Sequence, residues 1–336
     1  NVTVSYSRTA GETVGGSPYL ISATISAAPG VLDNYTITNT PASFTISNSS
    51  QTIAFGPLAD KTYGDAAFSL TGTASSGLII TYISGDPAVA SVSGTTVPIH
   101  KAGTVTITAS QPGNGNYSAA APVSRTFTIW KKTASLAATA QDKVYGTPDP
   151  SFTGTLTGFL AGDDVTATYS RTAGESVAGS PYTITGTLNA APGVLDNYTI
   201  TSTAADFSIT RVPASVIVNA SGKLFGDADP ALSGTVSGFL AGDNVTVSYS
   251  RTAGETVGGS PYLISANISA APGVLDNYTI TNTPASFTIS NSAQTIAFAP
   301  LADKTYGDAA FTLTGTASCG LIITYTSRDP GVASVT

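Results

Sequence analysis

The sequence has few charged residues and almost no histidine, cysteine or methionine. Only 10% of the 336 residues are charged, the net charge is −7, and there are one histidine, one cysteine and no methionine. So few cations in an acidic chain argue against a groove for nucleic acid and against binding to an anionic membrane surface. No apolar run approaches the roughly 18 residues that span a bilayer. We therefore expect no nucleic-acid partner and no membrane insertion in this segment.

The two scarce reactive residues do not predict a site. Cys319 is alone, so the chain can form no internal disulfide, and an earlier copy of the same stretch has Ser76 there. A cysteine that exchanges with serine is not expected to be a reactive thiol. His100 lies in IHKAGT, which is typical of a strand end that leads into a turn rather than of a catalytic triad or a zinc site.

The acidic residues do not form a recognisable metal-binding motif. No D-x-[DN]-x-[DN]-G calcium loop occurs, and Asp227, with its counterparts Asp65 and Asp308, is expected to cap or close a turn. Calcium at a module boundary is the alternative. We expect no enzyme activity and no catalytic residue, no cofactor and no metal ligand.

What the sequence does contain is repetition. Residues 1–93 and 244–336 differ at only nine positions at a shift of 243 residues, and YSRTAGE occurs three times. A shorter period follows the K-x-[YF]-G phrases at Lys61, Lys143, Lys223 and Lys304, which lie 82, 80 and 81 residues apart. We therefore expect a window on a longer array, in which both ends cut through a module.

The modules are of two kinds. One kind runs from K-x-[YF]-G through GFLAGD, YSRTAGE and APGVLDNYTI to F-[ST]-I, and the other has LIITYISGDPAVASVSGTTVPIHKAGTVTITA in its middle. The predicted modules are 1–47 (the back part of the first kind), 48–130 (second kind), 131–210 and 211–290 (both first kind), and 291–336 (the front part of the second kind).

Apolar and polar residues alternate with period two in nearly every segment that is not a turn. TVTITA is one example, and TGTLTGF, VTATYS, PYTITGTL, NYTIT and DFSIT are others, with Gly, Pro and Asn between them. The pattern predicts an all-β tandem array of small antiparallel β-sandwich, immunoglobulin-like modules of about 80 residues. The very short connections between modules favour an extended rod.

Two known families resemble this chain. VASVSGTTVPIHKAGTVTITA (89–109) resembles the back half of bacterial immunoglobulin-like domains, and K-x-Y-G, the inner NY and the closing F-x-I resemble the MBG and YDG modules of bacterial surface proteins. The resemblance implies an exported, extracellular adhesin or fibre at the bacterial surface. A β-grasp-like fold, as in some adhesin modules, is the alternative for the YSRTAGE kind, although it requires a helix.

Several recurring residues suggest specific roles. The lysines of K-x-[YF]-G could form covalent bonds to the asparagines Asn116, Asn197 and Asn277, but we expect solvated lysines because no acidic residue recurs obviously in both kinds as the proton shuttle. Arg8 is expected to pair with Glu12 across its turn. Trp130 is a candidate wedge between two modules.

The aromatic residues of K-x-[YF]-G and NY could have either of two roles. They are Tyr63, Tyr145, Phe225 and Tyr306, and Tyr35, Tyr117, Tyr198 and Tyr278. Exposed aromatics stack on sugars, whereas recurrent aromatics beside a recurrent glycine are more simply core or edge anchors, and we favour anchors.

Function is expected to follow from repetition. We predict a non-enzymatic stalk or spacer of a large bacterial surface adhesin or secreted fibre, with neighbouring modules as the main partners and lateral self-association into fibres as a further prospect. The alternative is that the repeats themselves bind glycans or host proteins multivalently.

Overall fold

The computed structural model describes residues 1–336 and contains strands, turns and three-residue 3-10 helices, with no α-helix. The all-β prediction is confirmed. None of these helices could cross a membrane. The chain forms two compact units, one of 1–141, 151–172 and 183–207 and the other of 142–150, 173–182 and 208–336. The division between the units runs through the predicted module 131–210.

The first unit begins with a three-stranded antiparallel sheet in 1–47 and a second group of strands in 48–130. The elements of 1–47 are β1 (Val2–Arg8), η1 (Val14–Gly16), β2 (Tyr19–Ala27), η2 (Leu32–Asn34) and β3 (Ala42–Phe44). Those of 48–130 are β4 (Ile53–Ala54), β5 (Lys61–Thr62), β6 (Phe68–Ser69), β7 (Thr73–Ala74), β8 (Thr81–Ser84), β9 (Thr96–Val97), β10 (Gly103–Ser110) and β11 (Val123–Trp130).

Alternation along β10 builds the core of 48–130. Val105, Ile107 and Ala109 are buried, while the threonines between them pair across the sheet with residues of β11. The sheet has the order β5-β11-β10-β8, and the pairs β4-β7 and β6-β9 complete the segment. Period two in the sequence is thus the period of burial.

The segment 131–210 contributes strands to both units. Its elements are β12 (Lys132–Ala138), β13 (Gln141–Val144), β14 (Gly154–Thr157), η3 (Ala161–Asp163), β15 (Thr166–Arg171), β16 (Tyr182–Asn189), η4 (Leu195–Asn197), β17 (Tyr198–Thr203) and β18 (Ala205–Thr210). In the first unit, β12 lies between β14 and β17, and β15 forms a hairpin with β16.

The second unit contains the complete segment 211–290. Its elements are β19 (Val212–Val218), β20 (Ser221–Leu224), β21 (Gly234–Ser237), η5 (Ala241–Asp243), β22 (Thr246–Arg251), η6 (Val257–Gly259), β23 (Tyr262–Ser269), η7 (Leu275–Asn277), β24 (Tyr278–Thr283) and β25 (Ala285–Ser290). Two short strands follow in 291–336, β26 (Ile296–Ala297) and β27 (Thr316–Ala317).

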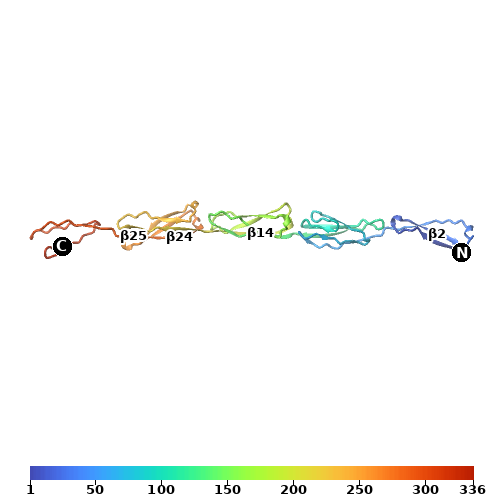
Figure 1. The fold of residues 1–336 in the computed structure, drawn as a ribbon, viewed down its shortest axis with the longest axis horizontal. Helices are drawn as coiled ribbons and strands as arrows, with labels where there is room; N and C mark the ends of the chain where they lie inside the picture. Colours follow the sequence, from blue (N-terminus) through green and yellow to red (C-terminus); the bar gives the residue numbers. More distant parts are fainter. The chain divides into compact units, whose positions relative to one another are not determined.

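The segment 211–290 is a two-sheet sandwich. One sheet has the order β21-β19-β24 and the other β20-β25-β23-β22, and β24 and β25 mark the two sheets in the orange bundle of Figure 1. Val218 from the first sheet packs with Ile264, Phe287 and Ile289 from the second. The predicted sandwich is therefore present.

The sheets are mixed, whereas the sequence predicted antiparallel sandwiches. β19 pairs with β24 in parallel, β20 pairs with β25 in parallel, and β5 and β11 are likewise parallel. Alternation reports which face of a strand is buried but not the direction of its neighbour, so the sequence pattern could not distinguish mixed sheets from antiparallel ones.

The β-grasp alternative fails for lack of a helix. Where GFLAGD might have begun one, the chain makes the single turn η3 or η5 and then enters the left-handed region at Asp164 (φ 48°) and Asn244 (φ 51°). Aspartate and asparagine tolerate this conformation better than other non-glycine residues. Each GFLAGD therefore ends in a single 3-10 turn that contains its aspartate.

Candidate functional site

Four joints connect the predicted modules along the chain. We call them the first joint (1–47 to 48–130), the second (48–130 to 131–210), the third (131–210 to 211–290) and the fourth (211–290 to 291–336). The first and second lie within the first compact unit, and the residues that form the third and fourth lie within the second.

Parallel pairing brings the K-x-[YF]-G aromatic to the end of its module. Because the short K-x strand runs parallel to the last strand, the aromatic residue that follows it lies beside the last residue of the module. The backbone N–H of Tyr63 donates to the carbonyl of Trp130, at an N···O distance of 2.9 Å. Phe225 makes the same bond to Ser290, also at 2.9 Å. These aromatics therefore face the next module.

Parallel pairing also brings the NY dipeptide to the start of its module. Tyr198 is in register with Lys132, and Tyr278 with Val212, at the beginning of the first strand of each module. Tyr117 forms the equivalent parallel bridge with Ser49. Each NY therefore faces the preceding module.

Aromatic rings and a shared aspartate form the second joint. The rings of Tyr63 and Tyr198 pack edge to face with centroids 5.5 Å apart, a favourable geometry for aromatic pairs. The Tyr63 hydroxyl lies 3.0 Å from Asp163 Oδ1, and the Tyr198 hydroxyl donates to Asp163 Oδ2. The buried cluster of 48–130 continues through Tyr63 and Tyr198 to Ala134. The core thus crosses the joint.

The third joint has the same arrangement, although the module on its N-terminal side is of the first kind and not of the second. Tyr145 packs against Tyr278 with centroids 5.7 Å apart, and its hydroxyl lies 3.1 Å from Asp243 Oδ1. The Tyr278 hydroxyl donates to Asp243 and accepts from the N–H of Leu240 at 3.0 Å. Two kinds of module thus present the same tyrosine to the same turn.

These contacts hold the tyrosines protonated. Removal from water and, next, the hydrogen bond to the neighbouring aspartate raise the pKa of Tyr198 and that of Tyr278 to about 12. The same causes raise the pKa of Tyr63 and that of Tyr145. Each hydroxyl is accordingly a donor to a carboxylate, and hydrogen bonds of that type are stronger than neutral ones.

The asparagine of NY accepts a hydrogen bond across three joints. Asn116 Oδ1 accepts from the N–H of Val14 at 3.2 Å in the first joint, Asn197 Oδ1 from Ala102 at 2.9 Å in the second, and Asn277 Oδ1 from Val177 at 2.8 Å in the third. Asn197 and Asn277 are buried. These asparagines therefore link neighbouring modules by hydrogen bonds.

The YSRTAGE stretch builds the loop that carries the donor. In 211–290 the Tyr262 hydroxyl folds back into this loop, accepting from the N–H of Thr256 at 3.1 Å and donating to its carbonyl at 2.9 Å. The Tyr262 ring leaves no room for a side chain at Gly254, whose φ is 148°. Val177 and Val14 lie in the equivalent loops of their modules. The loop that YSRTAGE builds therefore contacts the NY dipeptide of the next module.

An ion network fastens the same loop to its module. Lys223 Nζ lies 2.7 Å from Asp229 and 2.5 Å from Glu255, and Arg251 binds both of these acids. The Arg251 guanidinium also lies 4.7 Å from the centre of the Phe287 ring. These contacts lower the pKa of Asp229 to about 2, with the hydrogen bond from Arg251 as the largest cause.

The expectation of solvated lysines is therefore wrong in the first kind of module. Lys143 is buried and lies 2.7 Å from Asp149 Oδ1 while it also pairs with Glu175. The acids were missed because D-P and the Glu of YSRTAGE are far apart in sequence. By contrast, the predicted pairing of Arg8 with Glu12 is confirmed.

Trp130 does not wedge the second joint. Its side chain is 59% exposed, and only its carbonyl contributes, by accepting the hydrogen bond from Tyr63. The prediction of anchors is confirmed for Tyr63, Tyr198 and Tyr278, which are buried, whereas Tyr35, Phe225 and Tyr306 are exposed. A single tryptophan at a module boundary predicted the contacts between modules less well than the recurring tyrosines did.

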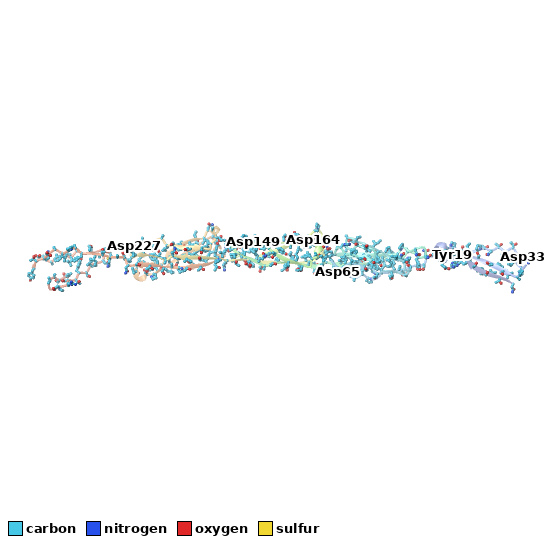
Figure 2. The ribbon with its side chains drawn as sticks, in the orientation of Figure 1. Tyr19, Asp33, Asp65, Asp149, Asp164 and Asp227 are labelled. Atoms are coloured by element: carbon cyan, nitrogen blue, oxygen red, sulfur yellow. The ribbon has the colours of Figure 1, made fainter.

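The other candidates take local roles. His100 Nε2 lies 2.8 Å from Ser91 Oγ at an exposed position. Asp65 Oδ2 accepts from the N–H of Thr62 at 2.8 Å, which confirms a turn role there. No three histidine, cysteine or acidic side chains gather into a metal site, and the aspartates labelled in Figure 2 belong to separate turns.

The comparisons with known families agree with these motifs. Residues 134–208 and 214–288 each match the family described as MBG domain (YGX type). These two segments are thus similar to MBG domains, as their K-x-[YF]-G and NY motifs predict. The MBG repeat family is typical of surface proteins and is not known for enzymatic activity. No curated protein sequence matches the chain. The resemblance of 48–130 to bacterial immunoglobulin-like domains stays a prediction.

Solved structures show only distant similarity. Drosophila N-cadherin EC1-4 is 8% identical with a TM-score of 0.23, covering 87% of this chain and 84% of that one. The S-layer protein rSbsC(31-844) is 14% identical with a TM-score of 0.22 over 81% and 45%. Bacteroides ovatus SGBP-B, solved with a mixed-linkage heptasaccharide, is 13% identical with a TM-score of 0.20 over 78% and 76%. Such TM-scores carry no weight for function.

Proposed function

We propose that this chain is a non-enzymatic stalk or spacer segment of a large bacterial cell-surface adhesin or secreted fibre. Its work is mechanical: it supplies length and resists bending, so that another part of the protein is held away from its anchor. MBG domains are found in surface repeat proteins, which supports this location.

One observation carries the proposal, namely that the same atoms recur at successive joints. An asparagine oxygen accepts from the preceding module in the first three joints, and a tyrosine pair shares an aspartate in the second and third. A flexible string of domains needs no such contacts, because short polar linkers suffice. Repeated, partly buried joints are the feature that a semi-rigid array requires.

A role in sugar binding receives less support. Three of the aromatics that would serve as stacking platforms, Tyr63, Tyr198 and Tyr278, are buried against other residues of the joints. A buried ring offers no face to a sugar. The recurrent aromatics are better explained as parts of joints, in agreement with a spacer.

Small-angle X-ray scattering of the full chain tests the proposal. An end-to-end array of roughly 120–160 Å would give a radius of gyration of about 35–45 Å, whereas a compact globule of this length would give about 20 Å. A value near the compact one would contradict the stalk. A glycan array provides the second arm, because saturable binding to one glycan class would replace the spacer with a binding module.

A further inference from the structure

The aromatic residue of K-x-[YF]-G varies with the module that follows it. Tyr63 and Tyr145 precede modules that contain GFLAGD, whereas Phe225 precedes 291–336, which belongs to the second kind and lacks GFLAGD. The three aromatics lie at the same place, beside the last residue of their modules, with the same backbone hydrogen bond at 2.9 Å. The difference is thus one hydroxyl at one position.

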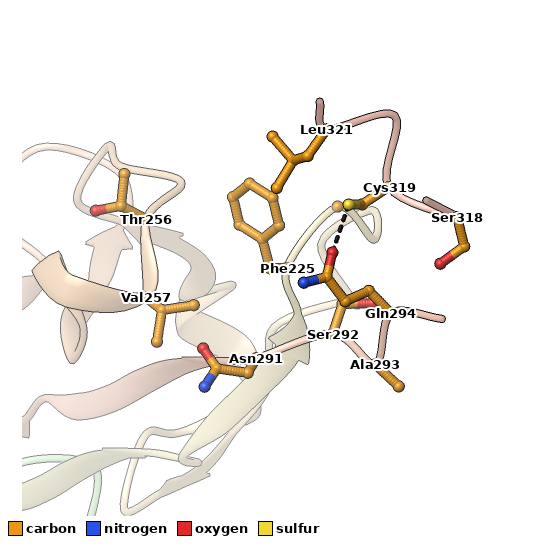
Figure 3. A pocket seen from close by; sticks show the side chains of 11 residues that line it. Phe225, Thr256, Val257, Asn291, Ser292, Ala293, Gln294, Ser318, Cys319 and Leu321 are labelled. Carbon is orange, nitrogen blue, oxygen red and sulfur yellow. Dashed lines mark hydrogen bonds between the residues drawn. The ribbon is translucent and has the colours of Figure 1, made fainter. Parts of the chain in front are cut away.

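The hydroxyl has a partner only where GFLAGD follows. The Tyr63 and Tyr145 hydroxyls bind Asp163 and Asp243, the aspartates of the two GFLAGD turns. Phe225 has no such partner among the residues of 291–336 that border it, which include Cys319 and Leu321 and no acidic residue. Figure 3 shows Leu321 beside the Phe225 ring and a hydrogen bond from Cys319 to Gln294.

A second contact follows the same division. The leucine of GFLAGD packs against the glycine after the tyrosine: a Cβ added at Gly64 would lie 3.0 Å from Leu160, and one added at Gly146 would lie 2.2 Å from Leu240. The corresponding Gly226 has nothing within 4 Å of such a Cβ. Tyr-Gly therefore meets Leu-Ala-Gly-Asp as a matched pair of surfaces.

We propose that this aromatic position selects the kind of module that can dock behind it, because tyrosine favours a GFLAGD module and phenylalanine does not. A phenylalanine before GFLAGD would remove one donor from a partly buried aspartate. A tyrosine before the second kind would place a hydroxyl beside Leu321 where no carboxylate receives it. The first mismatch leaves a partly buried aspartate short of one donor and so disfavours the wrong neighbour, whereas the second gains no contact. The selection does not depend on where the array is located or what it binds.

Hydrogen–deuterium exchange of the full chain tests the pairing at two joints. Tyr145→Phe should raise exchange at the Val177 and Leu240 amides of the third joint about tenfold or more, because a hydrogen bond to a charged group is lost. Phe225→Tyr, the matched reverse change, should leave exchange at 291–294 unchanged. Unaltered exchange at the Ile264 core amide confirms that both variants are folded.

A rearranged chain tests selection directly. Replacing 131–210 by a second copy of 211–290 puts a phenylalanine before the GFLAGD of the next module, and the third joint should lose protection. Changing that phenylalanine to tyrosine should restore protection. Two outcomes would overturn the inference: a third joint equally protected with either aromatic, or slower exchange at 291–294 in Phe225→Tyr.

Discussion

The asparagine of the third joint offers the sharpest test of how the modules are held together. Asn277 is 4% exposed, and its Oδ1 accepts from the N–H of Val177 at 2.8 Å. Asn277→Ala removes this acceptor and leaves the Val177 N–H without its partner at a buried contact. The same side chain also donates to the carbonyl of Gly273 within its own module, at 3.5 Å, so a control must separate the two bonds.

The expected magnitude follows from the orphaned donor. Leaving a buried N–H unsatisfied costs about 1–3 kcal/mol, and a free energy of 1.4 kcal/mol is about a factor of ten in an equilibrium. Opening of the third joint should therefore become roughly 5- to 150-fold more frequent. The rest of the module should keep its stability, because Ile264 and Phe287 lie in a separate buried cluster.

The chain contains its own control. Asn34 lies in the same VLDNY sequence and donates to the carbonyl of Gly30 at 3.0 Å, but its contacts stay within its own module. Exchange at the Val177 amide should rise in Asn277→Ala, while Asn34→Ala should lower stability only by the local bond. Equal thermal destabilisation by the two variants, with unchanged exchange at Val177, would refute the role of asparagine in the joint.

Three further outcomes are expected. In an alkaline titration followed by tyrosine absorbance, Tyr278 should ionise near pH 12, and because its folded pKa is raised, joint stability should be full below about pH 10 and lost as the pH rises through 12. In acid, Asp229 has a lowered pKa of about 2. Its ionised form should therefore stabilise the folded module fully above its usual pKa of 3.8, and this stabilisation should be lost as the pH falls through 2. A melting temperature that falls over this pH range would show the loss. Gly254→Ala should destabilise its module by about 1–3 kcal/mol or more, because the new Cβ would lie 2.0 Å from Tyr262. Gly258→Ala should not destabilise it, because a Cβ at Gly258 has open space around it. Equal melting temperatures of the two variants would contradict the packing described.

The strands could be predicted from the sequence wherever β-branched residues alternate with polar ones. TVTITA became β10 and PYTITGTL became most of β16. The first strand of the MBG domain, β12, was not among the predicted strands because KTASLAA is rich in alanine, which has weak strand propensity. Ala134 and Leu136 are nevertheless buried with period two, so the pattern was present without the usual residue types.

The joints could be predicted only in part. Recurrence singled out the aromatics and the asparagines correctly, since a residue kept at every repeat is needed at every repeat. Their location could not be deduced, because it depends on parallel pairing: Tyr63 reaches the module end through β5 and β11, and Tyr198 reaches the module start through β12 and β17. Strand direction depends on how the chain crosses between sheets, which hydrophobic period does not encode.

Differences between the two near-identical copies show which positions the array can change freely. Eight of the nine substitutions between 1–93 and 244–336 fall, in the first copy, on exposed residues, such as Thr24 and Gly85. The ninth, Ser76 to Cys319, is half-buried in the first copy and preserves a hydrogen bond, because each donates to a glutamine oxygen, Gln51 or Gln294.

By contrast, the motif residues that form the joints are unchanged in the copied stretch. The valine that donates to the next asparagine, the NY dipeptide and the Tyr-Gly of K-x-[YF]-G are the same in both copies. Solvent-facing positions tolerate change because a surface substitution alters stability little, whereas a joint residue must fit a partner in another module. The array therefore behaves as a set of matched ends, in which the surfaces between modules are held as closely as the cores within them.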